Sequence, residues 1–167
     1  RIDWLDRCIS SLVTNKDRIV DALSEDFGHR SKDQSMFTDV SAAIESLKHA
    51  RKHVRVWMKS EKRKPISPLG LFGARARVEF QPKGVIGVVA PWNFPVNLTY
   101  IPLAGVFAAG NRAMIKPSEF TPATSELMRE MVAAAFDETE LAVVTGGPEV
   151  GAAFSGLPFD HLLFTGA

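Results

Sequence analysis

Residues 84–97 read GVIGVVAPWNFPVN, and they indicate the fold class more clearly than any other part of the chain. The opening run, GVIGVVA, is apolar throughout, which is typical of a strand buried on both faces, as in a parallel sheet. The run ends at Pro91 and Pro95, which fix the backbone angle φ and have no N–H to donate to a neighbouring strand. The carboxamide of Asn93 is therefore held between two rigid turns at the point where a buried strand ends.

The chain after this stretch alternates between helical and strand patterns. Apolar helices are predicted over residues 98–109, 121–136 and 149–154, and short strands over 113–115, 141–144 and 161–164. Alternation of this kind predicts a parallel sheet with helices on both faces, in which His161 opens a buried strand. Thr121 and Pro122 start the middle helix, with a hydroxyl for the N-cap and a proline at the first helical position.

The first third of the chain has a different, purely helical pattern. Apolar residues recur every three to four positions up to Leu23, and again from Met36 to Trp57, as they do in amphipathic helices. Gly28 marks the end region of the first helix. Both apolar stripes, including Trp57, need a partner, so we expect these helices to pack beside the sheet.

A connector separates the helices from the apolar strand. Residues 61–73 are rich in proline and glycine, and residues 75–80 alternate as a strand with one exposed face does. The sequence thus predicts an α/β fold: a Rossmann-like parallel sheet with flanking helices, preceded by an N-terminal helical pair. The predicted division places the helices in 1–64, the connector and a hairpin strand in 65–83, and the α/β domain in 84–167.

Composition limits the class of protein. The 167 residues carry a net charge of +1, with 46% hydrophobic and 23% charged residues, which suits a globular domain and implies no bulk attraction to nucleic acid. The single cysteine, Cys8, excludes an internal disulfide and fits a reducing compartment, so we expect a cytoplasmic protein. No apolar run approaches the ~20 residues of a membrane helix, and we expect no membrane partner. The chain opens on Arg1 and stops directly after a turn glycine, so we expect a fragment.

The loops that follow the predicted strands are rich in polar and small residues. They read PWNFP at 91–95, KPSE at 116–119, TGGPEVG at 145–151 and FTGA at 164–167. Ligands of parallel sheets bind beyond the carboxyl ends of the strands. The glycines permit close approach to a phosphate, and Lys116 and Glu119 can reach one ligand from the same loop, where a carboxylate suits a ribose diol. No GxGxxG or GxxxxGK[ST] motif occurs, and the glycines by themselves fit ordinary turns equally well.

The order PWNFP, KPSE, TGGPEVG and FTG resembles the aldehyde dehydrogenase superfamily. The resemblance covers essentially the whole chain, because residues 4–31, WLDRCISSLVTNKDRIVDALSEDFGHRS, are similar to the two-helix start of the class-3-like members. Among these the chain looks most like the bacterial coniferyl aldehyde dehydrogenases. The resemblance makes residues 84–167 an NAD(P)-binding domain that stops before the catalytic domain.

By this resemblance Asn93 is a catalytic residue. In the family, the corresponding amide donates a hydrogen bond to the oxygen of the thiohemiacetal that forms when a cysteine attacks the aldehyde. A fixed donor at an oxygen that gains charge typically contributes about 10²–10³ in rate. The alternative is a turn asparagine whose side chain satisfies the local backbone.

The resemblance also implies a set of cofactor-binding residues. Lys116 and Glu119 match the residues that hold the adenosine ribose, and a carboxylate there repels a 2′-phosphate, so NAD is favoured while NADP stays possible. The alternative is a solvated surface pair. Ala167 stands where many relatives have serine, so a hydroxyl contact to phosphate is lost. The full implied set is Ala90, Pro91, Trp92, Lys116, Ser118, Glu119, Gly147, Phe164, Thr165 and Gly166.

The implied complete enzyme oxidises an aldehyde, with an aromatic, coniferyl-aldehyde-like compound as one candidate, to a carboxylic acid through a thioester. Family members are homodimers or homotetramers, and the hairpin at 75–83 is a candidate for bridging subunits. The family's cysteine nucleophile and glutamate base lie downstream, and Cys8 sits on an apolar helix stripe, so we expect the isolated fragment to be inactive. The alternative is a non-catalytic dinucleotide-binding or interaction module.

Two further patterns are weaker. His49 and His53 lie four positions apart on a predicted helix, which is metal-ligand spacing, but Lys48, Arg51 and other basic residues surround them and repel a cation. The same basic stretch lacks interleaved aromatic residues and belongs to a nearly neutral chain. We therefore expect neither a metal site nor a nucleic-acid partner.

Overall fold

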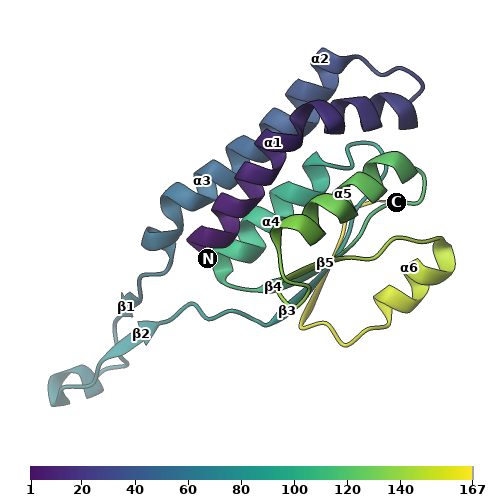
Figure 1. Cartoon of the computed structure of the whole chain (residues 1–167). Coiled ribbons are helices and arrows are strands. Elements are labelled where there is room, and N and C mark those ends of the chain that lie inside the picture. The colour runs from purple at the N-terminus through teal and green to yellow at the C-terminus, as the bar shows by residue number, and fades with distance from the viewer. Residues whose placement is uncertain (167) are drawn as a thin grey trace.

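The computed structural model describes residues 1–166 as a parallel sheet covered by helices, with a thin arm that projects from the body (Figure 1). The helices are α1 (Ile2–Asp26), α2 (Lys32–Ser35), the π-helix η1 (Met36–Ser41), α3 (Ala42–Trp57), the 3-10 helix η2 (Leu69–Phe72), α4 (Asn97–Ala109), α5 (Pro122–Ala135) and α6 (Pro148–Ser155). The strands are β1 (Glu61–Arg63), β2 (Ala76–Val78), β3 (Val85–Val89), β4 (Arg112–Lys116), β5 (Leu141–Val143) and β6 (His161–Phe164).

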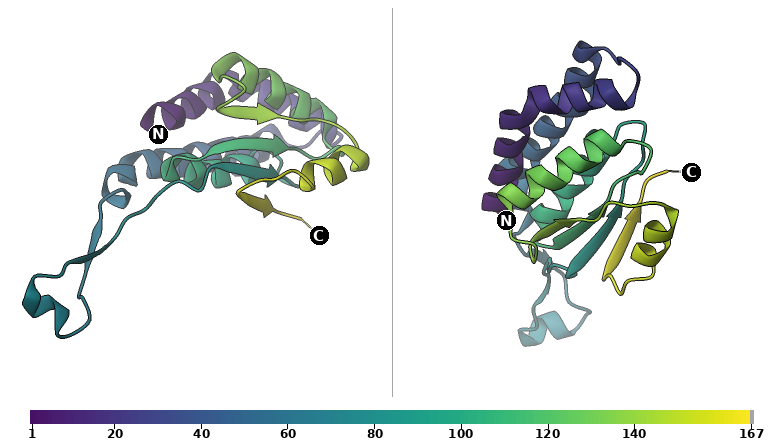
Figure 2. Two further views of the ribbon diagram at one scale, coloured as in Figure 1. Left: turned by 90° about the horizontal axis from the view of Figure 1, so that it is seen from below. Right: turned by 45° about the vertical axis from the view of Figure 1, so that its right-hand side comes forward.

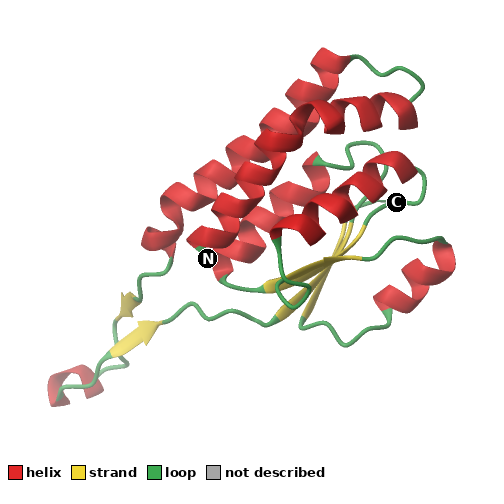
Figure 3. Cartoon of the chain, viewed as in Figure 1, coloured by secondary structure: helices red, strands yellow, loops and turns green. Residues whose placement is uncertain are grey.

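The main sheet is fully parallel, with the strand order β5-β4-β3-β6. The chain runs from β3 outward to β5 and then returns to the other side of β3, so α4 and α5 cover one face and α6 crosses the opposite face (Figures 2 and 3). The predicted Rossmann-like α/β fold is confirmed. The reversal of strand order creates a switch point between β3 and β6, which is where open parallel sheets bind ligands.

The register aligns the carboxyl ends of the strands at one edge. Val89 pairs with Lys116 on one side and with Phe164 on the other, and Ile115 pairs with Val143. The loops that follow these strands therefore start at the same edge of the sheet.

The N-terminal helices form a second layer. α1 and α3 pack on each other, α3 also packs on α4, and α1 also packs on α5 and α4, so these two helices lie mainly on the helices that cover the sheet. The apolar stripe of α1 is buried at Leu5, Cys8, Leu12, Ile19, Val20 and Leu23. The predicted burial of Trp57 is wrong: it is the last residue of α3, is 44% exposed, and stacks on the His53 ring with the ring centroids 5.7 Å apart.

The second predicted helix differs at its start. It begins with α2, where the Ser31 hydroxyl accepts from the Gln34 N–H at 3.5 Å, and passes through the π-helical turn η1 before α3. A π-helical turn inserts an extra residue, and apolar spacing alone does not reveal it. Gly28 ends the preceding helix with a φ of 61°, the left-handed conformation that favours glycine.

The arm contains a strand that the sequence pattern missed. β1 pairs with β2 in an antiparallel ribbon, with Glu61 opposite Val78, whereas residues 61–73 are predicted as connector only. All residues of β1 are exposed, so no apolar alternation marks it. The predicted strand at 75–80 is present in shorter form as β2.

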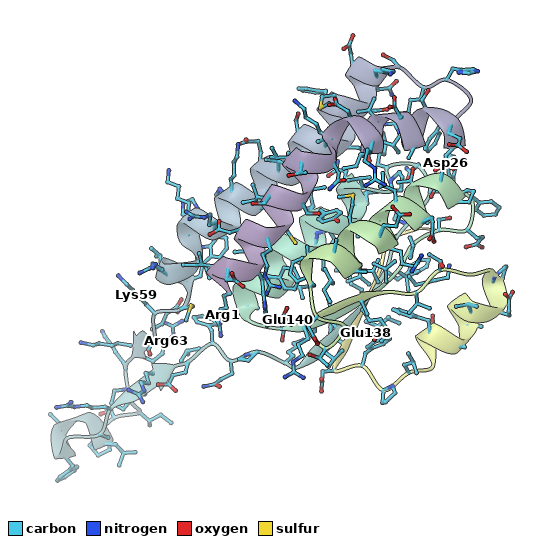
Figure 4. All side chains as sticks on the ribbon, viewed as in Figure 1. Arg1, Asp26, Lys59, Arg63, Glu138 and Glu140 are labelled. Atoms are coloured by element: carbon cyan, nitrogen blue, oxygen red, sulfur yellow. The ribbon has the colours of Figure 1, made fainter. Side chains whose placement is uncertain are left out.

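Two predictions about burial and capping are also wrong. His161 is exposed, because β6 lies at the edge of the sheet. The Thr121 side chain does not cap α5. Instead the carboxylate of Asp26, at the end of α1, accepts from the N–H groups of Ala123 and Thr124 at 2.9 and 2.8 Å (Figure 4). Within residues 1–166, no helix has both the length and the apolar character to cross a membrane.

Candidate active site

A cleft of about 620 Å³ lies at the carboxyl ends of β3, β4 and β6. Its volume falls in the range of small-molecule and cofactor sites. It is lined by Val89, Ala90, Pro91, Trp92, Asn93, Lys116, Pro117, Ser118, Glu119, Phe120, Pro148, Gly151, Ala152, Ser155, Phe164, Thr165 and Gly166. Every site residue implied by the sequence belongs to this lining except Gly147.

Gly147 stands one position before the lining. It is the N-cap of α6, and its neighbour Pro148 contacts the cleft. Ala167 lies outside the described residues. The sequence analysis did not predict that Ala152 and Ser155 of α6 line the cleft. The small residues at 151, 152 and 155 share one face of the helix, and this pattern could have indicated it.

Lys116 ends β4 and is 3% exposed. Its ammonium donates to the Pro117 carbonyl at 2.7 Å and to the Glu119 carboxylate at 3.3 Å. Glu119 is more exposed, and its own backbone N–H together with the Lys116 ammonium holds the pKa of its carboxyl below the ordinary value. The cleft thus has a buried cation and an ionised carboxylate on the same edge.

The loop after β3 presents Asn93 to the cleft. The sheet extends one residue past β3 on both sides, since the Ala90 N–H donates to the Lys116 carbonyl and the Thr165 N–H donates to the Val89 carbonyl, both at 3.1 Å. The chain then turns away, and Asn93 is exposed. Its carboxamide is thereby free of the sheet and open to a ligand in the cleft.

The far side of this loop is tied to the N-terminal helices. Asp39 of η1 is 0% exposed, and its carboxylate accepts from the N–H groups of Val96 and Asn97 at 3.2 and 3.1 Å, which caps α4. Burial raises the pKa of this carboxyl, while those two donors and the Arg30 guanidinium oppose the shift. Sequence reasoning missed Asp39, although a carboxylate beside Val40 on an apolar helix face was a signal.

Cys8 cannot act as a nucleophile. Its side chain lies on the buried face of α1 and is 1% exposed, as predicted. This burial raises the pKa of the thiol to about 12. A thiol of that pKa stays protonated at neutral pH, and only the thiolate attacks carbonyl carbon efficiently. Among residues 1–166, no group of three or more histidine, cysteine, aspartate or glutamate side chains is arranged to hold a metal ion.

Comparison with known proteins identifies the family. The model of the aldehyde dehydrogenase family matches residues 1–167. A probable coniferyl aldehyde dehydrogenase of Caulobacter vibrioides is 64% identical over 100% of this chain, and a coniferyl aldehyde dehydrogenase of a Pseudomonas species is 56% identical over 99%. The chain spans 35% and 34% of the length of these two relatives.

Solved structures agree on the fold. The substrate-bound state of Staphylococcus aureus AldH superposes with a TM-score of 0.91 at 31% identity, covering 97% of this chain and 35% of that one. A Mycobacterium tuberculosis aldehyde dehydrogenase complexed with NAD+ shares the fold, with a TM-score of 0.80 at 23% identity over 98% of this chain and 33% of its own. This chain belongs to the aldehyde dehydrogenase family.

Proposed function

We propose that this chain is the cofactor-binding part of an NAD(P)-dependent aldehyde dehydrogenase that oxidises an aldehyde to a carboxylic acid. The observation that carries the proposal is the meeting of Asn93, Lys116 and Glu119 in one cleft at the carboxyl ends of the strands. Coniferyl aldehyde is the candidate substrate, since the relatives at 64% and 56% identity are named for it. The complete protein is proposed to be a cytoplasmic homodimer or homotetramer.

The residues of the cleft fit a nicotinamide dinucleotide. A buried ammonium and an ionised carboxylate on one edge suit ribose hydroxyls, with Lys116 donating and Glu119 accepting. α6 contributes Gly151 to the lining of the cleft, next to the Lys116 side chain. Gly166 has a φ of 153°, which favours glycine and lets the backbone approach a phosphate closely. A nicotinamide cofactor held by these residues would supply the hydride acceptor for oxidation of the substrate carbon.

Asn93 is the residue of this chain that is proposed to contact the reacting atoms of the substrate. Attack of a nucleophile on an aldehyde moves negative charge onto the carbonyl oxygen. The Asn93 amide N–H donates to that oxygen, and a donor that is already in place costs no reorganisation during the reaction. Because Cys8 is buried, the attacking thiolate is proposed to come from residues outside these 167.

The test is oxidation of coniferyl aldehyde by the full-length protein, followed through NADH absorbance, with the Asn93→Ala variant assayed alongside. We expect aldehyde-dependent NADH formation that falls by about 10²–10³ in kcat in the variant, with little change in the dissociation constant for NADH. Absence of aldehyde-dependent NADH formation in the unmodified protein would overturn the proposal. Loss of NADH binding with kcat retained would show that Asn93 binds the cofactor and does not act on the substrate oxygen.

A further inference from the structure

A buried ion pair between Arg30 and Asp39 lies directly behind the loop that carries Asn93. The Arg30 guanidinium donates to Asp39 Oδ2 at 3.0 Å, and the two side chains are 8% and 0% exposed. The second carboxylate oxygen of Asp39, Oδ1, receives both N–H donors at the start of α4. The pair therefore fixes the loop from its C-terminal side.

Arg30 also reaches the loop from the other side. Its Nη1 donates to the backbone carbonyl of Asn93 at 3.4 Å. Its guanidinium lies between two aromatic rings, 5.0 Å from the centroid of Phe27 and 5.1 Å from that of Phe94. Phe27 in turn approaches the Trp92 ring, with centroids 6.4 Å apart. One guanidinium thus contacts the residue that bears the amide and the residue that follows it.

These contacts constrain backbone torsions of the loop that the prolines do not fix. Pro91 and Pro95 fix φ at their own positions, and Pro95 also restricts Phe94, but the torsions of Trp92 and Asn93 need other constraints. Asn93 is exposed, so packing of its own side chain does not hold it. A donor to a charged oxygen must be held to within a fraction of an ångström, and a misplacement of about 1 Å costs about 10² in rate.

We propose that Arg30 and Asp39 are positioning residues that hold the Asn93 backbone in the orientation that aims its carboxamide into the cleft. Asp39 lies in the π-helical turn η1, and such turns occur frequently at functional sites. The inference rests on the proposed role of Asn93 as the donor to the substrate oxygen. It predicts that the pair acts on turnover through Asn93 and leaves the Lys116–Glu119 edge unchanged.

The test is a double-mutant cycle in the full-length enzyme, with coniferyl aldehyde and NAD as substrates. Arg30→Lys keeps the charge beside Asp39 but loses the planar fork that also reaches Asn93. We expect it to lower kcat by about 10-fold to 100-fold per folded molecule, with the dissociation constant for NADH unchanged. In an Asn93→Ala background the same substitution should cause no further loss, because the group that it positions is already absent.

Two further variants separate positioning from general loss of stability. Arg7→Lys is the matched control: Arg7 makes a similar forked contact with Glu140, at 2.8 and 3.1 Å, but far from the loop, so its kcat should be unchanged. Thr38→Val removes a hydroxyl that accepts from Arg30 at 2.9 Å while keeping the side-chain shape, and it should lower kcat in the same direction as Arg30→Lys, but less. It supplies the measurement if Arg30→Lys does not fold.

The outcomes distinguish this inference from the proposed function. If Asn93→Ala lowers kcat but Arg30→Lys and Thr38→Val do not, the positioning role is wrong and the proposed function stands. The positioning role is also wrong if the effects of Arg30→Lys and Asn93→Ala multiply, since a merely structural substitution acts independently of Asn93. If Asn93→Ala leaves kcat unchanged, the catalytic role of Asn93 and the positioning role fail together.

Discussion

Glu119 keeps its negative charge because two donors hold its carboxylate. Its own backbone N–H and the buried Lys116 ammonium lower its pKa, so it is ionised throughout the neutral range. A fixed negative charge on the edge of the cleft attracts hydroxyl donors and repels a phosphate. The spacing in KPSE indicated this pair, but the burial of Lys116 depends on the strands and helix packed around it.

Glu119→Gln in the full-length enzyme tests the ribose role. Removing the charge should weaken the binding of NAD and relieve the repulsion of the 2′-phosphate of NADP. We expect the ratio of kcat/KM for NAD to that for NADP to fall on the order of tenfold, which corresponds to ~1.4 kcal/mol. Glu149→Gln, a carboxylate in the first turn of α6, is the control and should keep the ratio. Unchanged discrimination in Glu119→Gln would exclude the ribose contact.

Cys8→Ala tests the inertness of the buried thiol. Because its pKa is raised to about 12, the thiol is protonated at neutral pH and does not act as a nucleophile. Its removal should therefore leave kcat per folded molecule unchanged. The measurement is steady-state NADH formation with the folded fraction determined by circular dichroism. A variant that is folded yet has lost activity would contradict a purely structural Cys8.

Some helices and strands could be predicted from local sequence pattern, whereas others depend on contacts between distant parts of the chain. The apolar run of β3 and the proline at the start of α5 were readable, because burial on both faces and a missing N–H leave marks in the sequence itself. β1 and the cap of α5 were not readable. β1 is exposed and exists only through pairing with β2, and Asp26 reaches the N-terminus of α5 from a position 97 residues away in sequence.

Asp26→Ala should therefore destabilise α5. Two N–H groups at the helix start lose their acceptor, and the loss of an N-cap costs about 1 kcal/mol. We expect a lower melting temperature for the full-length protein, with partial recovery in Asp26→Asn, which keeps one acceptor oxygen. Glu25→Ala, an exposed neighbour on the same helix, serves as the control. Equal stability of Asp26→Ala and Glu25→Ala would show that solvent replaces the cap.

The whole molecule is joined by contacts between its N-terminal layer and its sheet. Arg7 and Trp4 of α1 both donate to the Glu140 carboxylate, which stands just before β5, and Arg7 also donates to the Ala135 carbonyl. These donors lower the pKa of Glu140 to about 2. A carboxyl whose pKa falls on folding stabilises the folded state above its unfolded pKa, and that contribution is lost as the pH drops toward the folded value.

The difference in melting temperature between the unmodified protein and Glu140→Gln should accordingly be largest at neutral pH. It should shrink as the pH falls from about 5 toward about 2, because the unmodified carboxyl becomes protonated over that range. Glu138→Gln, which changes an exposed carboxylate two positions away, is the control and should leave the melting temperature unchanged. A constant difference between about pH 7 and about pH 3 would mean that the charge of Glu140 does not hold the two layers together.

The parallel sheet and the loops that form the cleft could be predicted from the amino-acid sequence alone. Both follow from local pattern, since buried parallel strands are continuous apolar runs and their carboxyl ends meet at one edge. The contacts around the Asn93 loop and the cap of α4 became visible in the folded structure. Those contacts join Arg30 and Asp39 to residues 63 and 57 positions away, and no local pattern encodes a partner at that separation.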